Sequence, residues 1–161
     1  MTLRTLLGGV AIVAAVVAAP ATPLDAQTDR AHLGPRLTYN FDAEVFGLGA
    51  QLGVPIARRL EFYPSFDVYF PESGSLWALN VDVKYRVTAD RSADWLYVGG
   101  GLNLTGLDRR GTDRTDAGAN VLFGVEPLRG RVHPFGEARL ILGDGSSFQL
   151  AGGLNITLGR H

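Results

Sequence analysis

The residues best suited to acid–base chemistry are three histidines, His32, His133 and His161. His133, Glu137 and Arg139 stand at alternate positions of one segment, so in a β-strand their side chains would share a face. An imidazole beside a carboxylate can act as a general acid or base. Because no nucleophile stands at a readable spacing from His133, we interpret it as a histidine satisfied inside the fold and predict no catalytic residue.

The segment 108–116 is a second candidate, because it holds three aspartates. Carboxylate oxygens are the ligands that Ca²⁺ prefers. Three arginines are interleaved with them, Arg109, Arg110 and Arg114, and their charge would repel a cation. We therefore expect a solvated loop and predict neither a metal site nor a cofactor.

The other charges of interest are nearly balanced in sign and recur on the polar side of alternating segments. They are Arg36, Lys84, Arg86 and Arg139 on the basic side, and Glu61, Asp67, Asp82, Glu126 and Glu137 on the acidic side. Buried charges are stable only when they are paired. The balance predicts an internal ion-pair network, since a lining of one sign would instead indicate a selective pore.

The elements that carry these charges follow a period of two, which is typical of strands. Between 77 and 87 every odd-numbered residue is apolar or aromatic, whereas Asp82, Lys84 and Arg86 stand at even-numbered positions. A helix would distribute those charges around its whole surface, whereas a strand collects them on one face.

Eight segments of this kind follow one another and are separated by short stretches of turn-forming residues. The expected strands are 33–41, 45–56, 60–70, 77–87, 95–105, 117–127, 132–142 and 148–158. An even number of strands joined by short connections predicts an all-β, antiparallel up-and-down barrel that leaves no free sheet edge. Pro64 interrupts the third strand, and we expect a β-bulge there.

The composition of the polar faces indicates which side of the barrel faces outward. In 95–105 and 148–158 the polar face has no charged residue, and only one of the 15 basic residues of the chain, Lys84, is a lysine. A water-exposed surface normally carries charges at about 25–35% of its positions. Small side chains instead suit the narrow interior of an eight-stranded barrel. The apolar face is therefore predicted to contact lipid, in a transmembrane β-barrel.

Aromatic residues of the apolar face cluster at strand ends, as in the girdles that mark the two membrane interfaces. One rim is expected to hold Tyr39, Phe41, Phe46, Phe70, Trp77 and Phe148, and the other Phe62 and Tyr85. Strand length agrees, because about 11 residues tilted by about 40° span roughly 28 Å, against an apolar band of about 25 Å.

The first residues of the chain differ from the rest. Arg4 precedes an uncharged apolar run over 6–19, which is too short for a spanning helix but typical of a cleavable secretory signal. We expect a signal peptide at 1–26 and a mature domain at 27–161. The chain has no cysteine, and its net charge of -1 gives no reason to expect nucleic acid as a partner.

The mature part resembles the small outer-membrane β-barrel proteins of the OmpX and OmpA-barrel type over nearly its whole length. The resemblance lies in WLYVGGGL (95–102), GANVLFGVE (118–126), PFGEAR (134–139) and LAGGLNI (150–156). It implies a cell outer-membrane location, with periplasmic turns at 57–59, 89–94 and 129–131. It also implies contact with outer-membrane lipid and lipopolysaccharide, and recognition by the barrel-assembly machinery. Where such proteins commonly end on an aromatic residue, this chain has Leu158 followed by Gly159, Arg160 and His161.

The leading functional interpretation is a non-enzymatic outer-membrane barrel, structural or surface-interacting, with a lumen filled by small residues and ion pairs. No specific protein partner is identifiable. Three alternatives stay open: a small pore, a soluble periplasmic lipocalin-like barrel that binds an apolar ligand, and a lipid A-modifying barrel enzyme. Barrels that deacylate lipid A carry a His and a Ser two residues apart on one strand, whereas here Phe135 follows His133 at that spacing.

Overall fold

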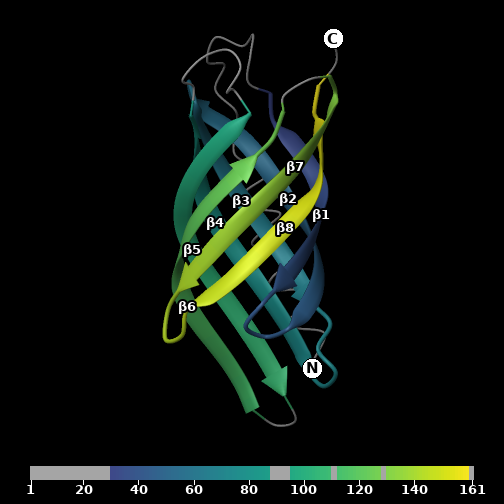
Figure 1. Ribbon diagram of the computed structural model, residues 1–161, viewed down its shortest axis with the longest axis vertical. Coiled ribbons are helices and arrows are strands. Elements are labelled where there is room, and N and C mark those ends of the chain that lie inside the picture. The colour runs from purple at the N-terminus through teal and green to yellow at the C-terminus, as the bar shows by residue number, and fades with distance from the viewer. Residues whose placement is uncertain (1–29, 88–94, 110–111, 128–129, 160–161) are drawn as a thin grey trace.

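The structure is a computed structural model, which describes residues 30–87, 95–109, 112–127 and 130–159 (Figure 1). The predicted signal peptide at 1–26 lies outside these residues. Eight strands make up the fold: β1 (His32–Asn40), β2 (Val45–Ala57), β3 (Leu60–Tyr69), β4 (Ser75–Val87), β5 (Leu96–Arg109), β6 (Thr112–Val125), β7 (Val132–Leu142) and β8 (Ser147–Thr157). Among the described residues there is no helix of the length and hydropathy needed to span a membrane.

The strands close into a barrel in which each one pairs antiparallel with its neighbours along the chain. β1 also pairs with β8, for example at Leu33↔Ile156, so the sheet has no first or last strand within the barrel wall. Every backbone N–H and C=O of the wall can therefore find a partner in the next strand. The predicted eight-stranded up-and-down barrel is confirmed.

The polarity of the wall is inverted relative to a water-soluble protein. On β4, Val81 and Val83 are 41% and 39% exposed, whereas Asp82 and Lys84 between and beside them are 0% and 1% exposed. Alternate residues of a strand point to opposite faces, so the same inversion follows along the other strands. The prediction that the apolar face is the outer face is confirmed.

The structure corrects the prediction of a loop over 108–116. β5 continues to Arg109 and β6 begins at Thr112, and the two strands pair throughout, including Thr105↔Asp116 and Asp108↔Asp113. β6 pairs with β7 only as far as Ala119↔Leu142. The residues 112–118 therefore belong to a hairpin that projects past β7, at the lower end of the barrel in Figure 1.

The bulge expected at Pro64 is also wrong. Pro64 pairs in regular register with Val81 of β4. The register shift lies on the partner strand, between Pro55 and Ala57 of β2, next to the two-residue turn to β3. A proline has no N–H to donate to the ladder, and at Pro55 the irregularity falls at the barrel end, where fewer neighbouring pairs depend on it.

Candidate functional site

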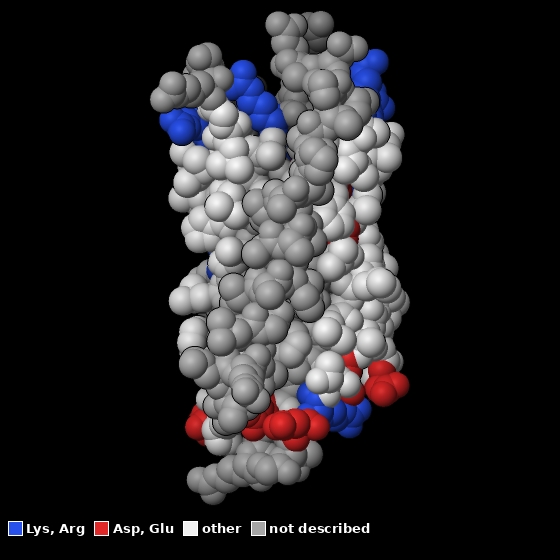
Figure 2. Space-filling view, turned by 180° about the vertical axis from the view of Figure 1, so that it is seen from behind, with Lys and Arg blue, Asp and Glu red and all other residues white. Residues whose placement is uncertain are grey.

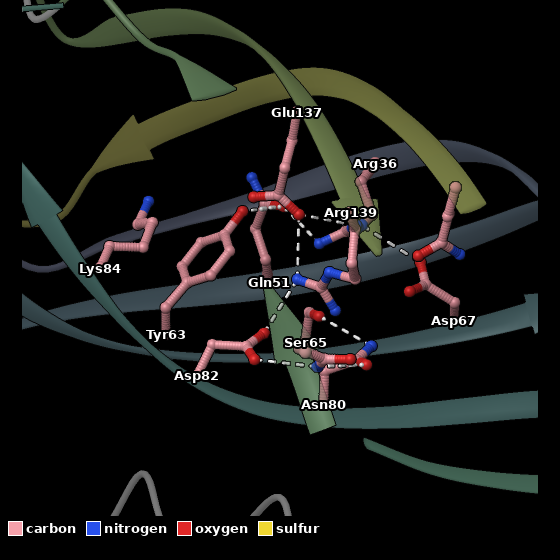
Figure 3. Close-up of polar contacts among 12 residues, drawn as sticks. Arg36, Gln51, Tyr63, Ser65, Asp67, Asn80, Asp82, Lys84, Glu137 and Arg139 are labelled. Carbon is pink, nitrogen blue, oxygen red and sulfur yellow. Dashed lines mark hydrogen bonds and ion pairs between the residues drawn. The ribbon is translucent and has the colours of Figure 1, made fainter. Parts of the chain in front are cut away.

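The buried charges of the lumen form two groups. The first, the central cluster, consists of Arg36, Asp67, Asp82, Glu137 and Arg139, all at most 3% exposed (Figure 3). Arg36 Nε lies 3.2 Å from Asp67 Oδ1, and its Nη2 lies 3.4 Å from Glu137 Oε1. Arg139 Nη2 lies 2.9 Å from both Asp82 Oδ2 and Glu137 Oε1. Glu137 therefore bridges the two arginines, while Asp67 and Asp82 each pair with one of them.

The second group, the mouth cluster, lies toward the end where β1 begins and β8 ends. It consists of His32, Glu61, Lys84, Arg86, Glu126 and His133. Lys84 Nζ lies 2.9 Å from Glu61 Oε1 and 3.5 Å from Glu126 Oε2. Arg86 Nη2 repeats the arrangement, at 3.1 Å from Glu61 Oε2 and 3.2 Å from Glu126 Oε2. Each of the two carboxylates therefore contacts both cations.

Two tyrosine rings separate the clusters. Lys84 Nζ lies 3.6 Å from the centre of the Tyr63 ring and 4.5 Å from that of Tyr97. A cation over an aromatic face is attracted by the ring quadrupole. Tyr97 donates a hydrogen bond of 2.9 Å to Glu137 Oε2 on the far side, and Tyr63 lies between Lys84 and Glu137 in Figure 3. Tyr97 thus connects the two clusters through its ring and its hydroxyl.

Side-chain amides satisfy much of the remaining hydrogen-bonding capacity of the lumen. Asn155 donates to Glu126 Oε1 at 2.7 Å and accepts from Gln51 at the same distance. Asn120 donates to Asp82 Oδ1 at 2.9 Å and to Asn80 Oδ1 at 3.0 Å. A water-filled channel would leave such side chains accessible, but the four amides, Gln51, Asn80, Asn120 and Asn155, are all buried. The described part of the lumen is therefore plugged.

Glycines of the inner face make room for these large side chains. A β-carbon on Gly124 would overlap the Tyr97 ring, and one on Gly53 would overlap His32 and Glu61. The outward-facing Gly136 has its nearest neighbour, a Val125 methyl group, at 3.7 Å from such a β-carbon. The inner glycines are thus required by packing.

His133 has partners that resemble a catalytic triad without its geometry. Its Nε2 lies 3.5 Å from Thr157 Oγ1, and its Nδ1 lies 3.8 Å from Glu126 Oε1. The shortest contact of Nε2 is the Gly130 carbonyl oxygen, at 2.7 Å. That nitrogen must therefore carry the proton, and it cannot accept one from Thr157 as a general base must. No group of three or more potential ligands among the described residues could hold a metal ion.

The structure brings every residue of the expected lumen network into an ion pair with another member. The sequence interpretation missed His32, Gln51, Tyr63 and Tyr97 as partners. The sequence pattern does place Tyr63 inside the barrel, because Tyr63 shares the odd-numbered face of β3 with Glu61 and Asp67. It likewise places Tyr97 on the inward face at the start of β5. No comparable pattern marks which charges pair across the lumen.

The predicted interface aromatics separate to the two ends of the wall. Tyr39, Phe41 and Phe46 are in ring contact, with centroids 4.8 and 4.7 Å from Tyr39, and Phe41 lies 5.4 Å from Phe148. Phe70, which directly follows β3, and Trp77 near the start of β4 belong to the same end. Phe62 and Tyr85 lie toward the opposite end. Trp95 is also exposed at that end, and the sequence interpretation did not include it among the interface aromatics.

The two ends also differ in charge, as Figure 2 shows with blue at its upper end and mainly red at its lower end. We call the exposed Arg30, Arg58, Arg59 and Arg131 the arginine rim. We call the exposed Asp42, Glu44, Glu72, Asp113 and Asp144 at the other end the acidic rim. Arg114, an exposed base at the same end, pairs with Asp116 at 2.7 Å and with Asp144 at 3.7 Å.

Comparison with known proteins establishes the fold. No protein-family model matches the chain, and no curated protein matches it by sequence. The N-terminal β-barrel domain of Pseudomonas aeruginosa OprF matches with a TM-score of 0.67 at 12% identity, over 80% of this chain and 96% of that one. Neisserial surface protein A (NspA) matches with a TM-score of 0.55 at 19% identity, over 80% and 95%. The chain has the fold of small outer-membrane β-barrels, and the resemblance is confirmed at that level.

Proposed function

We propose that this protein is a non-enzymatic outer-membrane β-barrel, exported to that membrane, with a structural or surface-interacting role. The observation that carries the proposal is the inverted polarity of the wall. The barrel exposes apolar side chains such as Leu102 and Phe123 while it buries Arg36 and Arg139. Burying that apolar band in lipid removes the cost of exposing it to water.

The inner surface supports a plugged barrel over a pore. Opening a path along the axis would separate buried ion pairs such as Arg36–Asp67 and Arg139–Asp82. Removing the partner of a buried charge costs about 3–5 kcal/mol. The polar, filled lumen also leaves no apolar cavity for the ligand of a lipocalin-like barrel, within the part of the chain that the structure describes.

The projecting hairpin favours the surface-interacting role. Its outer strand, 112–118, has no pairing partner among the described residues on the side away from β5, because β7 ends at Leu142. An unpaired strand edge presents free N–H and C=O groups to which an extended segment can hydrogen-bond. We propose that this end faces the cell exterior, near lipopolysaccharide, and that the turns of the arginine rim face the periplasm, where the barrel-assembly machinery acts.

Fractionation tests the membrane assignment. The full chain, expressed in a Gram-negative host, is expected in the outer-membrane fraction and to migrate faster on a gel before boiling than after it. In planar bilayers the folded barrel is expected to give no steady conductance. Recovery in the soluble periplasmic fraction would refute the membrane barrel, and stable single-channel steps would refute the plug.

Cysteine labelling tests the orientation, because the chain has no cysteine of its own. We expect Asp113→Cys to react with a membrane-impermeant maleimide on intact cells. Arg131→Cys, the matched control on the opposite rim, should react only after the outer membrane is permeabilised. The reverse pattern would show that the arginine rim faces outward.

A further inference from the structure

We infer that the barrel binds the phosphate of an anionic phospholipid at one site, a pocket between Arg59 and Arg86 at the arginine rim. The pocket is lined by Pro55, Arg59, Leu60, Glu61 and Arg86, and it has room for one water-sized group. A single phosphate oxygen has that size. The inference rests on the proposed function, because a lipid can reach this site only if the barrel sits in a membrane.

The bulge in β2 explains why a pocket exists here. The register shift between Pro55 and Ala57 disturbs the pairing of β2 with β3 just before the turn. Bulges at barrel rims re-aim side chains and end regular pairing. The opening therefore lies where the lumen, the turn and the outer wall meet.

Arg86 supplies a donor that the lumen does not use. Its Nη2 contacts both Glu61 and Glu126, but its buried Nη1 donates no hydrogen bond to any described residue. A buried, unsatisfied guanidinium N–H is costly. Glu61 and Glu126 are balanced together by Lys84 and Arg86. The net positive charge at the pocket is therefore that of Arg59. A phosphate oxygen would satisfy Nη1.

Arg59 occupies a backbone position that arginine disfavours. It is the second residue of the two-residue turn between β2 and β3, and its φ is 79°. Glycine is the residue that adopts such a φ without strain. The arginine side chain thus stands at the pocket at a conformational cost, which is a common property of residues held in place for binding.

The outer wall next to the pocket suits the rest of a lipid. Ile56 and Tyr85 are exposed at 48% and 43%, and Leu60 pairs with Tyr85 across the β3–β4 ladder. An acyl chain can lie along this apolar surface while the phosphate stays at the rim. Arginine matches phosphate well, because its planar fork donates two parallel hydrogen bonds. These features favour a lipid headgroup over free phosphate.

The test is retention of phosphatidylglycerol against phosphatidylcholine by the full, folded chain in a neutral detergent, read by native mass spectrometry. We expect the parent to retain one phosphatidylglycerol about five-fold more strongly than phosphatidylcholine. Arg59→Gly should abolish that preference while the urea midpoint stays equal or rises, because glycine relieves the turn. Arg59→Glu should retain less phosphatidylglycerol than phosphatidylcholine.

The chain offers a matched control at the other end. Glu44 is the second described non-glycine residue with positive φ, at 53°, so Glu44→Gly makes the same backbone change far from the pocket and should leave lipid retention unchanged. Equal retention by the parent and Arg59→Gly would overturn the inference, as would complete displacement of the lipid by inorganic phosphate. Failure of the chain to insert into neutral phosphatidylcholine vesicles would instead count against the proposed function.

Discussion

The central cluster and the mouth cluster of the lumen use similar charges but differ in redundancy. Among the residues that the structure describes, Asp82 of the central cluster forms an ion pair with Arg139 alone, and Asp67 with Arg36 alone. In the mouth cluster Lys84 and Arg86 each contact the same two carboxylates. Two clusters with equal numbers of buried ion pairs can therefore differ in how much the stability of the barrel depends on any single residue.

The largest effect is expected for Arg139→Ala in the central cluster. The change leaves Asp82 buried without a cation and leaves Glu137 with Arg36 as its remaining ion-pair partner. The loss in free energy of unfolding should be about 3–5 kcal/mol, the usual cost of orphaning a buried charge. Urea titration in lipid vesicles, followed by the gel shift of the folded form, measures it.

Lys84→Ala is the matched variant in the mouth cluster. Arg86 continues to contact both Glu61 and Glu126 after the change, so the loss should be clearly smaller, about 1–2 kcal/mol. Equal losses for Arg139→Ala and Lys84→Ala, measured by the same titration, would show that the contrast in redundancy has no energetic meaning.

A double-mutant cycle sharpens the same point. In the absence of Lys84, Arg86 is the one described lysine or arginine that still pairs with Glu61 and Glu126. Lys84→Ala with Arg86→Ala should therefore cost more than the sum of the single changes, by about 1–3 kcal/mol of coupling. Strictly additive losses would contradict shared contacts.

Gly124→Ala tests how tightly the Tyr97 ring is packed between the central cluster and the mouth cluster. The added methyl group must displace the Tyr97 ring, which should cost about 1–3 kcal/mol, as overpacking does. Gly136→Ala is the control on the outer face, where the added methyl group makes only an ordinary van der Waals contact, and should change stability by less than about 1 kcal/mol. The difference in urea midpoint between the two variants is the measurement.

The smallest effect is expected for Tyr97→Phe, which keeps the ring and removes the hydroxyl that donates to Glu137. The loss should be about 1.5 kcal/mol, the lower end of the range for a hydrogen bond to a charged group, because Glu137 keeps both of its arginine partners. A loss as large as that of Arg139→Ala would mean that the two clusters act as one unit.

Within the apolar band the sequence predicts both the strands and the direction of each face. The alternation of apolar and polar residues, as in 77–87, fits only a strand with its apolar face outward there. The prediction failed in two places. Beyond the apolar band no apolar face is needed, so residues 112–116 of β6 show no alternation and their sequence predicts a loop. Pro55 and Pro64 both violate strand rules, and only the register shows that Pro55 lies beside the bulge.

The pairing of charges across the lumen depends on more than local sequence. Arg36 on β1 and Glu137 on β7 flank β8 only because β1 closes onto β8. Their contact at 3.4 Å therefore depends on the stagger of all eight strands. The inward orientation of each charge follows from alternation, whereas its partner follows from the closed geometry.

Closure of β1 onto β8 has a consequence for how the proposed membrane barrel inserts. A barrel lacking its final strand would expose two rows of unpaired N–H and C=O groups to hydrocarbon, at several kcal/mol for each group. Intermediates with a few strands inserted are thus disfavoured, and the two ends of the barrel segment must meet before the wall is stable in lipid. Insertion should therefore be a single cooperative event, slow because its decisive contact joins residues from opposite ends of the sequence.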